Sequence, residues 1–256
     1  MNANLAHLLE RALAAPDRAL YRHWTGERWD DVTAADVAAR AARWQAAFRR
    51  EGYGAGDRIA VALRNGIQWV AIDQAALGLG LVVVPLYVDD NADNIAWFVE
   101  HAQARLVVVD GSRMANALRG LDGRYALPPI VVLRADAGEP AASAERWLPE
   151  ADRAFEVRDV TPGTLATICY TSGTTGLAKG IVHAHRYVLA HEEFLHCHEV
   201  EDGERFHGMG ECAWAAGIAP LLGPWRLGAV QCVYRRVTLP AAMMPMNSIR
   251  SHSQRV

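Results

Sequence analysis

A dense group of hydroxyl residues and glycines, together with one lysine, occupies residues 171–180. It directly follows an apolar run over residues 165–170 and reads Thr171-Ser172-Gly173-Thr174-Thr175-Gly176-Leu177-Ala178-Lys179-Gly180. A strand that ends in such a loop can direct backbone N–H groups, hydroxyls and an ammonium at one polyphosphate. Glycine lets the backbone approach the ligand closely, and lysine supplies a compact, mobile positive charge. The expected chemistry is therefore the binding of a polyphosphate, and the alternative is a solvated turn between two elements.

Histidines and a second glycine-rich pattern give weaker indications. The loop is not a Walker A loop, since no Gly-Lys-Ser/Thr follows a glycine at the required spacing. His191 and His196 are five residues apart, so on a helix they diverge by roughly 140° and cannot share a metal ion. The alternate spacing of His183 and His185 suits one face of a strand rather than the helix expected there. We therefore predict no metal site, with each histidine either solvated or satisfied in the core.

Composition limits the classes of protein that fit. Of 256 residues, 51% are hydrophobic and 21% are charged, which suffices for one sizeable core or two small ones. The formal net charge of −3 provides no basic field for nucleic acid or an anionic membrane. The N-terminus lacks a secretory signal, and the longest apolar stretch, residues 75–88, is too short and interrupted to span a bilayer. Four cysteines without short paired spacing suit a reducing compartment. These features predict a soluble, cytoplasmic protein.

Hydrophobic periodicity predicts strands that alternate with helices. Helices are expected near the start, closed by Pro16, and over residues 33–50, 66–79, 91–104, 112–118 and 186–198. Strands are expected over residues 19–24, 27–30, 58–63, 81–87, 105–110, 130–133, 165–170 and 229–234. Residues 135–161 are expected to form a surface excursion. The alternation indicates an α/β protein with mainly parallel sheets flanked by helices, and the apolar runs indicate strands buried on both faces.

The loop resembles the signature Tyr-Thr-Ser-Gly-Thr-Thr-Gly-x-Pro-Lys-Gly of adenylate-forming enzymes, the superfamily of acyl-CoA synthetases, peptide-synthetase adenylation domains and luciferases. The one departure is Ala178 in place of proline, which frees φ without removing a phosphate ligand. The resemblance to acyl-CoA synthetases extends from about residue 5 to residue 235, through weaker hydrophobic matches in the same order along the chain.

That resemblance implies a ligase that joins a carboxylic acid, for example a fatty acid, to CoA. The acid and ATP give an acyl-adenylate and pyrophosphate, and the thiol of CoA then displaces AMP. The β- and γ-phosphates would be held by Ser172, Thr174, Thr175 and Lys179, with Thr171 as a further hydroxyl and Gly173 and Gly176 permitting close approach. Lys179 and Thr175 would be the catalytic residues of the loop. Trp214 and Gly217 would line the acyl pocket, although a large aromatic there is equally consistent with simple core.

The resemblance also implies an incomplete protein. Residues 1–236 are expected to form part of the N-terminal AMP-binding domain, and residues 237–256 an irregular tail. The downstream segments for adenine, ribose and Mg²⁺, and the C-terminal lid domain with its lysine, have no counterpart in the sequence. We therefore expect a truncated N-terminal portion that is inactive alone. Two other classes stay open: a non-catalytic ATP- or anion-binding module, and a half enzyme completed by a second chain.

Overall fold

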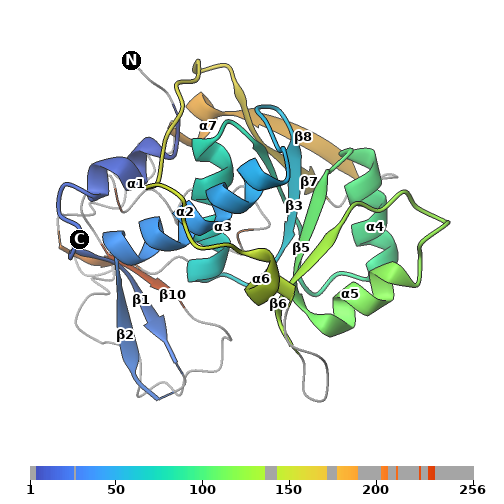
Figure 1. Ribbon diagram of the computed structural model, residues 1–256, viewed down its shortest axis with the longest axis horizontal. Helices are drawn as coiled ribbons and strands as arrows, with labels where there is room; N and C mark the ends of the chain where they lie inside the picture. The colour runs from blue at the N-terminus through green and yellow to red at the C-terminus, as the bar shows by residue number, and fades with distance from the viewer. Residues whose placement is uncertain are drawn as a thin grey trace, which may run out of the picture.

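Two β-sheets organise the chain in the computed structural model (Figure 1). The structure describes residues 4–25, 27–135, 143–171, 178–189, 203–206, 212, 225 and 230–233. The larger sheet has six strands in the order β6-β5-β3-β4-β7-β8. Its strands are β3 (Arg58–Ala62), β4 (Val82–Pro85), β5 (Leu106–Gly111), β6 (Ile130–Arg134), β7 (Leu165–Thr171) and β8 (Lys179–Ala184). The first five are parallel, whereas β8 runs antiparallel to β7.

Helices cover both faces of this sheet (Figure 1). On one face lie α2 (Ala34–Arg50) and α3 (Ile67–Gly78), and on the other α4 (Ala92–His101) and α5 (Ser112–Arg119). Successive residues of a strand point to opposite faces of the sheet. In β3, Ile59 and Val61 belong to the hydrophobic cluster on the side of α2 and α3 (the α2/α3 cluster). Ala60 and Ala62 belong to the cluster on the side of α4 and α5 (the α4/α5 cluster). The continuous apolar runs of the sequence are therefore strands buried on both sides, as predicted.

Local sequence signals set the starts of two helices. Thr33 caps α2 by accepting a hydrogen bond from the Asp36 backbone, and the Asp36 carboxylate accepts from the Thr33 backbone in return, a capping box. Asn91 caps α4 by accepting from the Asn94 backbone at 2.8 Å. The predicted helix starts at these two positions are confirmed.

The smaller sheet brings together segments far apart in the sequence. Its order is β2-β1-β10-β9, formed by β1 (Ala19–Trp24), β2 (Trp29–Thr33), β9 (Arg205–Phe206) and β10 (Val230–Val233). The antiparallel β1–β2 pair corresponds to the strands expected over residues 19–24 and 27–30, with β2 placed later than expected. The parallel pairing of β1 with β10 joins the beginning of the chain to residues more than two hundred positions later.

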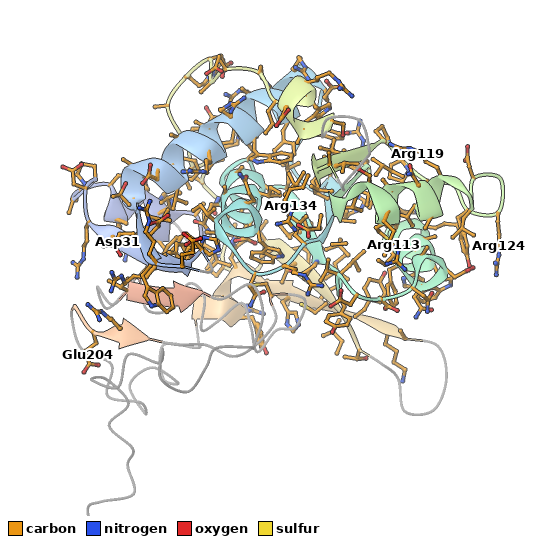
Figure 2. The ribbon with its side chains drawn as sticks, turned by 90° about the horizontal axis from the view of Figure 1, so that it is seen from below. Asp31, Arg113, Arg119, Arg124, Arg134 and Glu204 are labelled. Atoms are coloured by element: carbon orange, nitrogen blue, oxygen red, sulfur yellow. The ribbon has the colours of Figure 1, made fainter. Side chains whose placement is uncertain are left out.

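Charged side chains lie on the outside of this arrangement (Figure 2). Arg119 and Arg124 project at the end of the molecule formed by α4 and α5, and Asp31 and Glu204 at the end formed by the small sheet. All four residues are exposed. Both signs of charge thus occur on the surface, in keeping with the small net charge of the chain.

Two expectations need correction. No strand was predicted directly after the glycine-rich loop, yet residues 179–184 form β8, because they pair along their length with β7. The segment 135–161 is only partly a surface excursion. It contains α6 (Ser143–Trp147), whose Trp147 ring lies 5.4 Å from that of Trp44 in α2. Further along, Gln45 of α2 donates to the Glu156 carbonyl at 2.8 Å, so this segment covers α2 and α3.

Candidate functional site

The glycine-rich loop joins the ends of a β-hairpin. Thr171 is the last residue of β7 and Lys179 the first of β8, and the two are directly paired across the ladder. Since β7 lies parallel to β4, the loop leaves the sheet at the carboxyl ends of the parallel strands. Ligands of open α/β sheets bind outside that edge. The position expected for the loop, directly after a core strand, is therefore confirmed.

Two of the candidate phosphate ligands can be described. Thr171 is half-buried and Lys179 exposed, and as a cross-strand pair their side chains leave the same face of the hairpin. Lys179 is the only lysine of the chain. Among the described residues, no carboxylate forms an ion pair with it. The base of the loop thus carries a hydroxyl and an ammonium side by side, a combination suited to phosphate oxygens.

The remaining loop candidates fall outside the described residues. These are Ser172, Gly173, Thr174, Thr175 and Gly176, together with the acyl-pocket candidates Trp214 and Gly217. Their roles stay predictions.

Ala178, the position where the signature has proline, is described. It is partly buried and packs against the α4/α5 cluster. Its methyl group therefore meets a hydrophobic surface beside the loop, and packing rather than a fixed φ holds this end of the loop.

Two of the histidines singled out by the sequence have distinct surroundings. His183 lies in β8, with its ring stacked 4.2 Å from that of Tyr187. His185 is fully buried, and its Nδ1 accepts a hydrogen bond from the backbone N–H of Leu5 at 3.1 Å. Burial lowers the pKa of His185 to about 4, so the ring is neutral at pH 7. His185 therefore ties the N-terminal segment to the end of the hairpin, while His191 and His196 lie outside the described residues.

A buried carboxyl near β7 was not identified from the sequence. Asp73 sits on α3 with 3% exposure and accepts a hydrogen bond from Gln74 Nε2 at 3.0 Å. Burial, the larger effect, raises its pKa to about 7, and the bond from Gln74 lowers it. Burial raises the pKa values of Cys169 on β7 and Tyr21 on β1; the charge of Asp73 raises both further, in the case of Tyr21 after the charge of Cys212. The available signal was the pair Asp73-Gln74 in the middle of an otherwise apolar helix.

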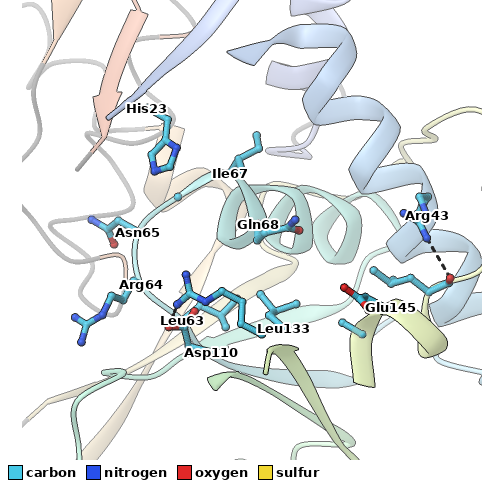
Figure 3. A pocket seen from close by; sticks show the side chains of 14 residues that line it. His23, Arg43, Leu63, Arg64, Asn65, Ile67, Gln68, Asp110, Leu133 and Glu145 are labelled. Carbon is cyan, nitrogen blue, oxygen red and sulfur yellow. Dashed lines mark hydrogen bonds and ion pairs between the residues drawn. The ribbon is translucent and has the colours of Figure 1, made fainter. Parts of the chain in front are cut away.

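A cavity of about 510 Å³ opens at the same edge of the sheet, beside β3, β5 and β6 (Figure 3). The strand order reverses here, because the chain passes from β3 to β4 on one side and then to β5 and β6 on the other. Such a switch point is the usual location of a ligand crevice. Its walls include Leu63, Arg64 and Asn65 after β3, Asp110 of β5 and Arg134 of β6.

The three arginines that line this cavity already have hydrogen-bond partners. Arg64 donates to Asp89 at 3.0 Å, and Arg134 is paired with Asp110. Arg43, from α2, donates to the backbone carbonyl of Pro149 at 3.0 Å. The lining is mixed, with Leu63 and Leu133 beside these groups, and the bonds leave its arginines little capacity to attract an anion.

The described part of the chain offers neither a membrane-spanning helix nor a cluster of metal ligands. None of its helices combines the length and the apolar character needed to cross a bilayer. The same residues contain no group of three or more His, Cys, Asp and Glu side chains placed to hold a metal ion.

Comparison with known proteins places these features in a family. The sequence model described as "AMP-binding enzyme" matches residues 8–255. A long-chain fatty acid–CoA ligase of Mycobacterium bovis is 28% identical over 182 residues, which are 68% of this chain and 30% of that protein. A long-chain fatty acid–CoA ligase of Thermus thermophilus is 32% identical over 192 residues, 73% of this chain and 34% of that protein.

Solved structures agree on the fold. The anthranilate–CoA ligase AuaEII, crystallised with anthranoyl-AMP, superposes with a TM-score of 0.79 at 20% identity, covering 91% of this chain and 45% of that one. The chain thus spans about a third of the two curated relatives and under half of this structure. Over that span its parallel sheet and flanking helices match the N-terminal part of adenylate-forming enzymes. The chain belongs to the AMP-binding enzyme family.

Proposed function

We propose that this chain supplies the phosphate-binding loop of an ATP-dependent carboxylic acid–CoA ligase. The observation that carries the proposal is the direct pairing of Thr171 with Lys179 at the carboxyl end of β7. That pairing fixes both ends of the signature segment within one hairpin and sets an ammonium beside a hydroxyl. Ser172, Thr174 and Thr175 would add hydroxyl donors between these two ends.

The proposed role of the loop is to hold the β- and γ-phosphates of ATP. A carboxylate oxygen of the substrate attacks the α-phosphorus, and the bond from that phosphorus to the oxygen bridging to the β-phosphate breaks. Negative charge accumulates on the departing pyrophosphate, where Lys179 and the hydroxyls stabilise it. By fixing the outer phosphates, the loop also aligns the α-phosphate for in-line attack. The thiol of CoA then attacks the acyl carbon and AMP leaves.

The loop alone should bind ATP weakly. A charge-assisted hydrogen bond contributes about 1.5–3 kcal/mol net. Three or four of them oppose an association cost of about 4–15 kcal/mol. We therefore propose an affinity on the order of millimolar or weaker for this chain, and turnover only when the remaining parts of the enzyme are supplied.

The acid substrate is proposed only as a class. The relatives named above act on long-chain fatty acids, and another, from Thauera aromatica, is named a 3-hydroxybenzoate/4-hydroxybenzoate–CoA ligase. Those substrates share a carboxylate and little else. The proposal is therefore a fatty or aromatic carboxylic acid.

A labelling experiment tests the loop directly. Because Lys179 is the only lysine, an amine-reactive acetylating reagent modifies two amines, Lys179 and the α-amino group. We expect ATP to slow the acetylation of Lys179 while leaving the α-amino group, an internal control, unaffected. The Lys179→Ala variant should lose ATP binding in calorimetry, and Lys179→Arg should retain part of it because the charge remains. Equal acetylation of Lys179 with and without saturating ATP would refute the proposal.

Pyrophosphate release separates the proposal from its two alternatives. A non-catalytic ATP- or anion-binding module would show the same protection of Lys179, but it would release no pyrophosphate under any condition. A half enzyme completed by a second chain would release pyrophosphate from ATP and a carboxylic acid only after that chain is added.

A further inference from the structure

The ring of Tyr170 lies across the hairpin at the base of the loop. Tyr170 on β7 is paired with Gly180 on β8. A Cβ placed on Gly180 would come within 3.3 Å of two Tyr170 ring atoms and within 3.2 Å of Ile168 Cγ2. Glycine at this position therefore allows the ring to lie flat over the neighbouring strand. The residues next in each strand, Thr171 and Lys179, project from the opposite face.

Helix α4 holds this ring from the other side. The Tyr170 ring lies 4.4 Å from that of Phe98, and its hydroxyl is 2.8 Å from Nδ1 of His101 in the last turn of the helix. His101 in turn stacks on Trp97 at 4.8 Å. Burial raises the pKa of Tyr170 to about 12, so its hydroxyl stays protonated; it bonds Nδ1 of His101 and also donates to the Phe98 carbonyl at 3.4 Å. His101 is otherwise an exposed residue, and this hydrogen bond reaches 69 positions along the chain.

We propose that His101 is a positioning residue for the phosphate loop, acting through Tyr170. Among the described strands, β8 is an edge strand and pairs only with β7. An edge hairpin opens more readily than an interior strand. The Tyr170 ring, clamped between Gly180 and His101, fixes the hairpin end at which Thr171 and Lys179 meet. The role rests on the proposed function, because it concerns the geometry that the loop presents to ATP.

Simple packing of an aromatic cluster is the alternative explanation. If packing alone mattered, the polar atom of His101 would be dispensable, and an apolar or short side chain in contact with Trp97 would serve as well. If the hydrogen bond matters, a side chain with a hydrogen-bonding atom near the position of Nδ1 is needed. The side-chain amide of Asn, which can accept or donate, lies close to that position, so His101→Asn is the conservative variant and His101→Leu the apolar one.

The experiment is a double-mutant cycle on the full chain, formed by His101→Leu, Tyr170→Phe and the two together, with His101→Asn added. Glu100→Ala is the matched control, since this α4 neighbour accepts from the backbone of Ala126 instead. Two quantities are measured for each: amide hydrogen exchange of residues 165–185 without ligand, and the dissociation constant for ATP.

We expect His101→Leu and Tyr170→Phe each to speed exchange at the hairpin end and to weaken ATP binding roughly threefold to tenfold, as one net hydrogen bond would. The double variant should be no worse than Tyr170→Phe alone, because that change already removes the bond to His101 together with the bond to the Phe98 carbonyl. His101→Asn and Glu100→Ala should stay within about twofold of the wild type, well inside one net hydrogen bond.

Three results would overturn the proposal. One is unchanged hairpin exchange in His101→Leu, even if Lys179→Ala abolishes ATP binding, in which case the proposed function stands. Another is additive effects in the double variant. The third is a wild-type chain that does not bind ATP, which removes the proposed function and the role of His101 together, whatever the exchange rates show.

Discussion

The pH dependence of stability should report the buried carboxyl of Asp73. Its pKa is about 7 in the folded protein, against a usual value of 3.8, because burial penalises the charged form. Between these two pH values the folded protein holds a proton that the unfolded chain has released. Stability therefore falls as the pH rises from about 4 to about 7 and is level above that range. At about 1.4 kcal/mol per pH unit, the full effect is on the order of 4 kcal/mol.

Asp73→Asn removes this titration and keeps an amide oxygen to accept from Gln74. We expect the variant to gain on the wild type as the pH rises, with the difference in unfolding free energy growing by about 2–3 kcal/mol between pH 5 and pH 8. Nearby Tyr21 and Cys169 do not titrate in this range, since burial raises the pKa of each above its usual value. Urea unfolding at the two pH values measures the difference, and exposed Asp17→Asn is the control. A difference between the wild type and the Asp73→Asn variant that stays constant from pH 5 to pH 8 would refute the reasoning.

Three further changes probe the capping box, the buried histidine and the hairpin. Thr33→Ala removes the N-cap of α2 and should lower the unfolding free energy by about 1 kcal/mol, measured by urea unfolding; a loss below a few tenths would contradict the capping geometry. His185→Phe leaves the Leu5 N–H without its acceptor and should cost about 1–3 kcal/mol at pH 7. Since the pKa of His185 is lowered to about 4, the wild type loses stability as the pH falls below about 6.5 and the variant should not; parallel profiles from pH 7 to pH 4.5 would count against this. Gly180→Ala crowds the Tyr170 ring and should lower the unfolding free energy by about 1–3 kcal/mol. It should also weaken ATP binding, and urea unfolding and calorimetry measure the two effects. A variant with unchanged stability and ATP binding would contradict the close contact between Gly180 and the ring.

Much of the architecture followed from local patterns. The apolar run 81–87 predicted a strand buried on both faces, and β4 is buried along its length. The helix expected over residues 33–50 is α2, and its start is local in origin, because the capping box of Thr33 and Asp36 involves only residues three apart. The glycine-rich loop was recognised for the same reason, since all its residue types lie within ten positions. Interactions between residues close in the chain can therefore be predicted from the sequence.

Contacts between residues far apart in the chain could not be predicted from the sequence in this way. Residues 179–184 carry no clear alternation of buried and exposed positions, and they form β8 because β7 offers them a partner. Asp73 has its raised pKa because the fold closes α3 against β7, and His101 meets Tyr170 because α4 packs on the same sheet. The sequence alone determined the elements and the phosphate-loop motif. The tertiary structure decided the partners of Lys179, Tyr170 and Asp73, since hydrogen bonding, close packing and burial between distant segments exist only once the chain has folded.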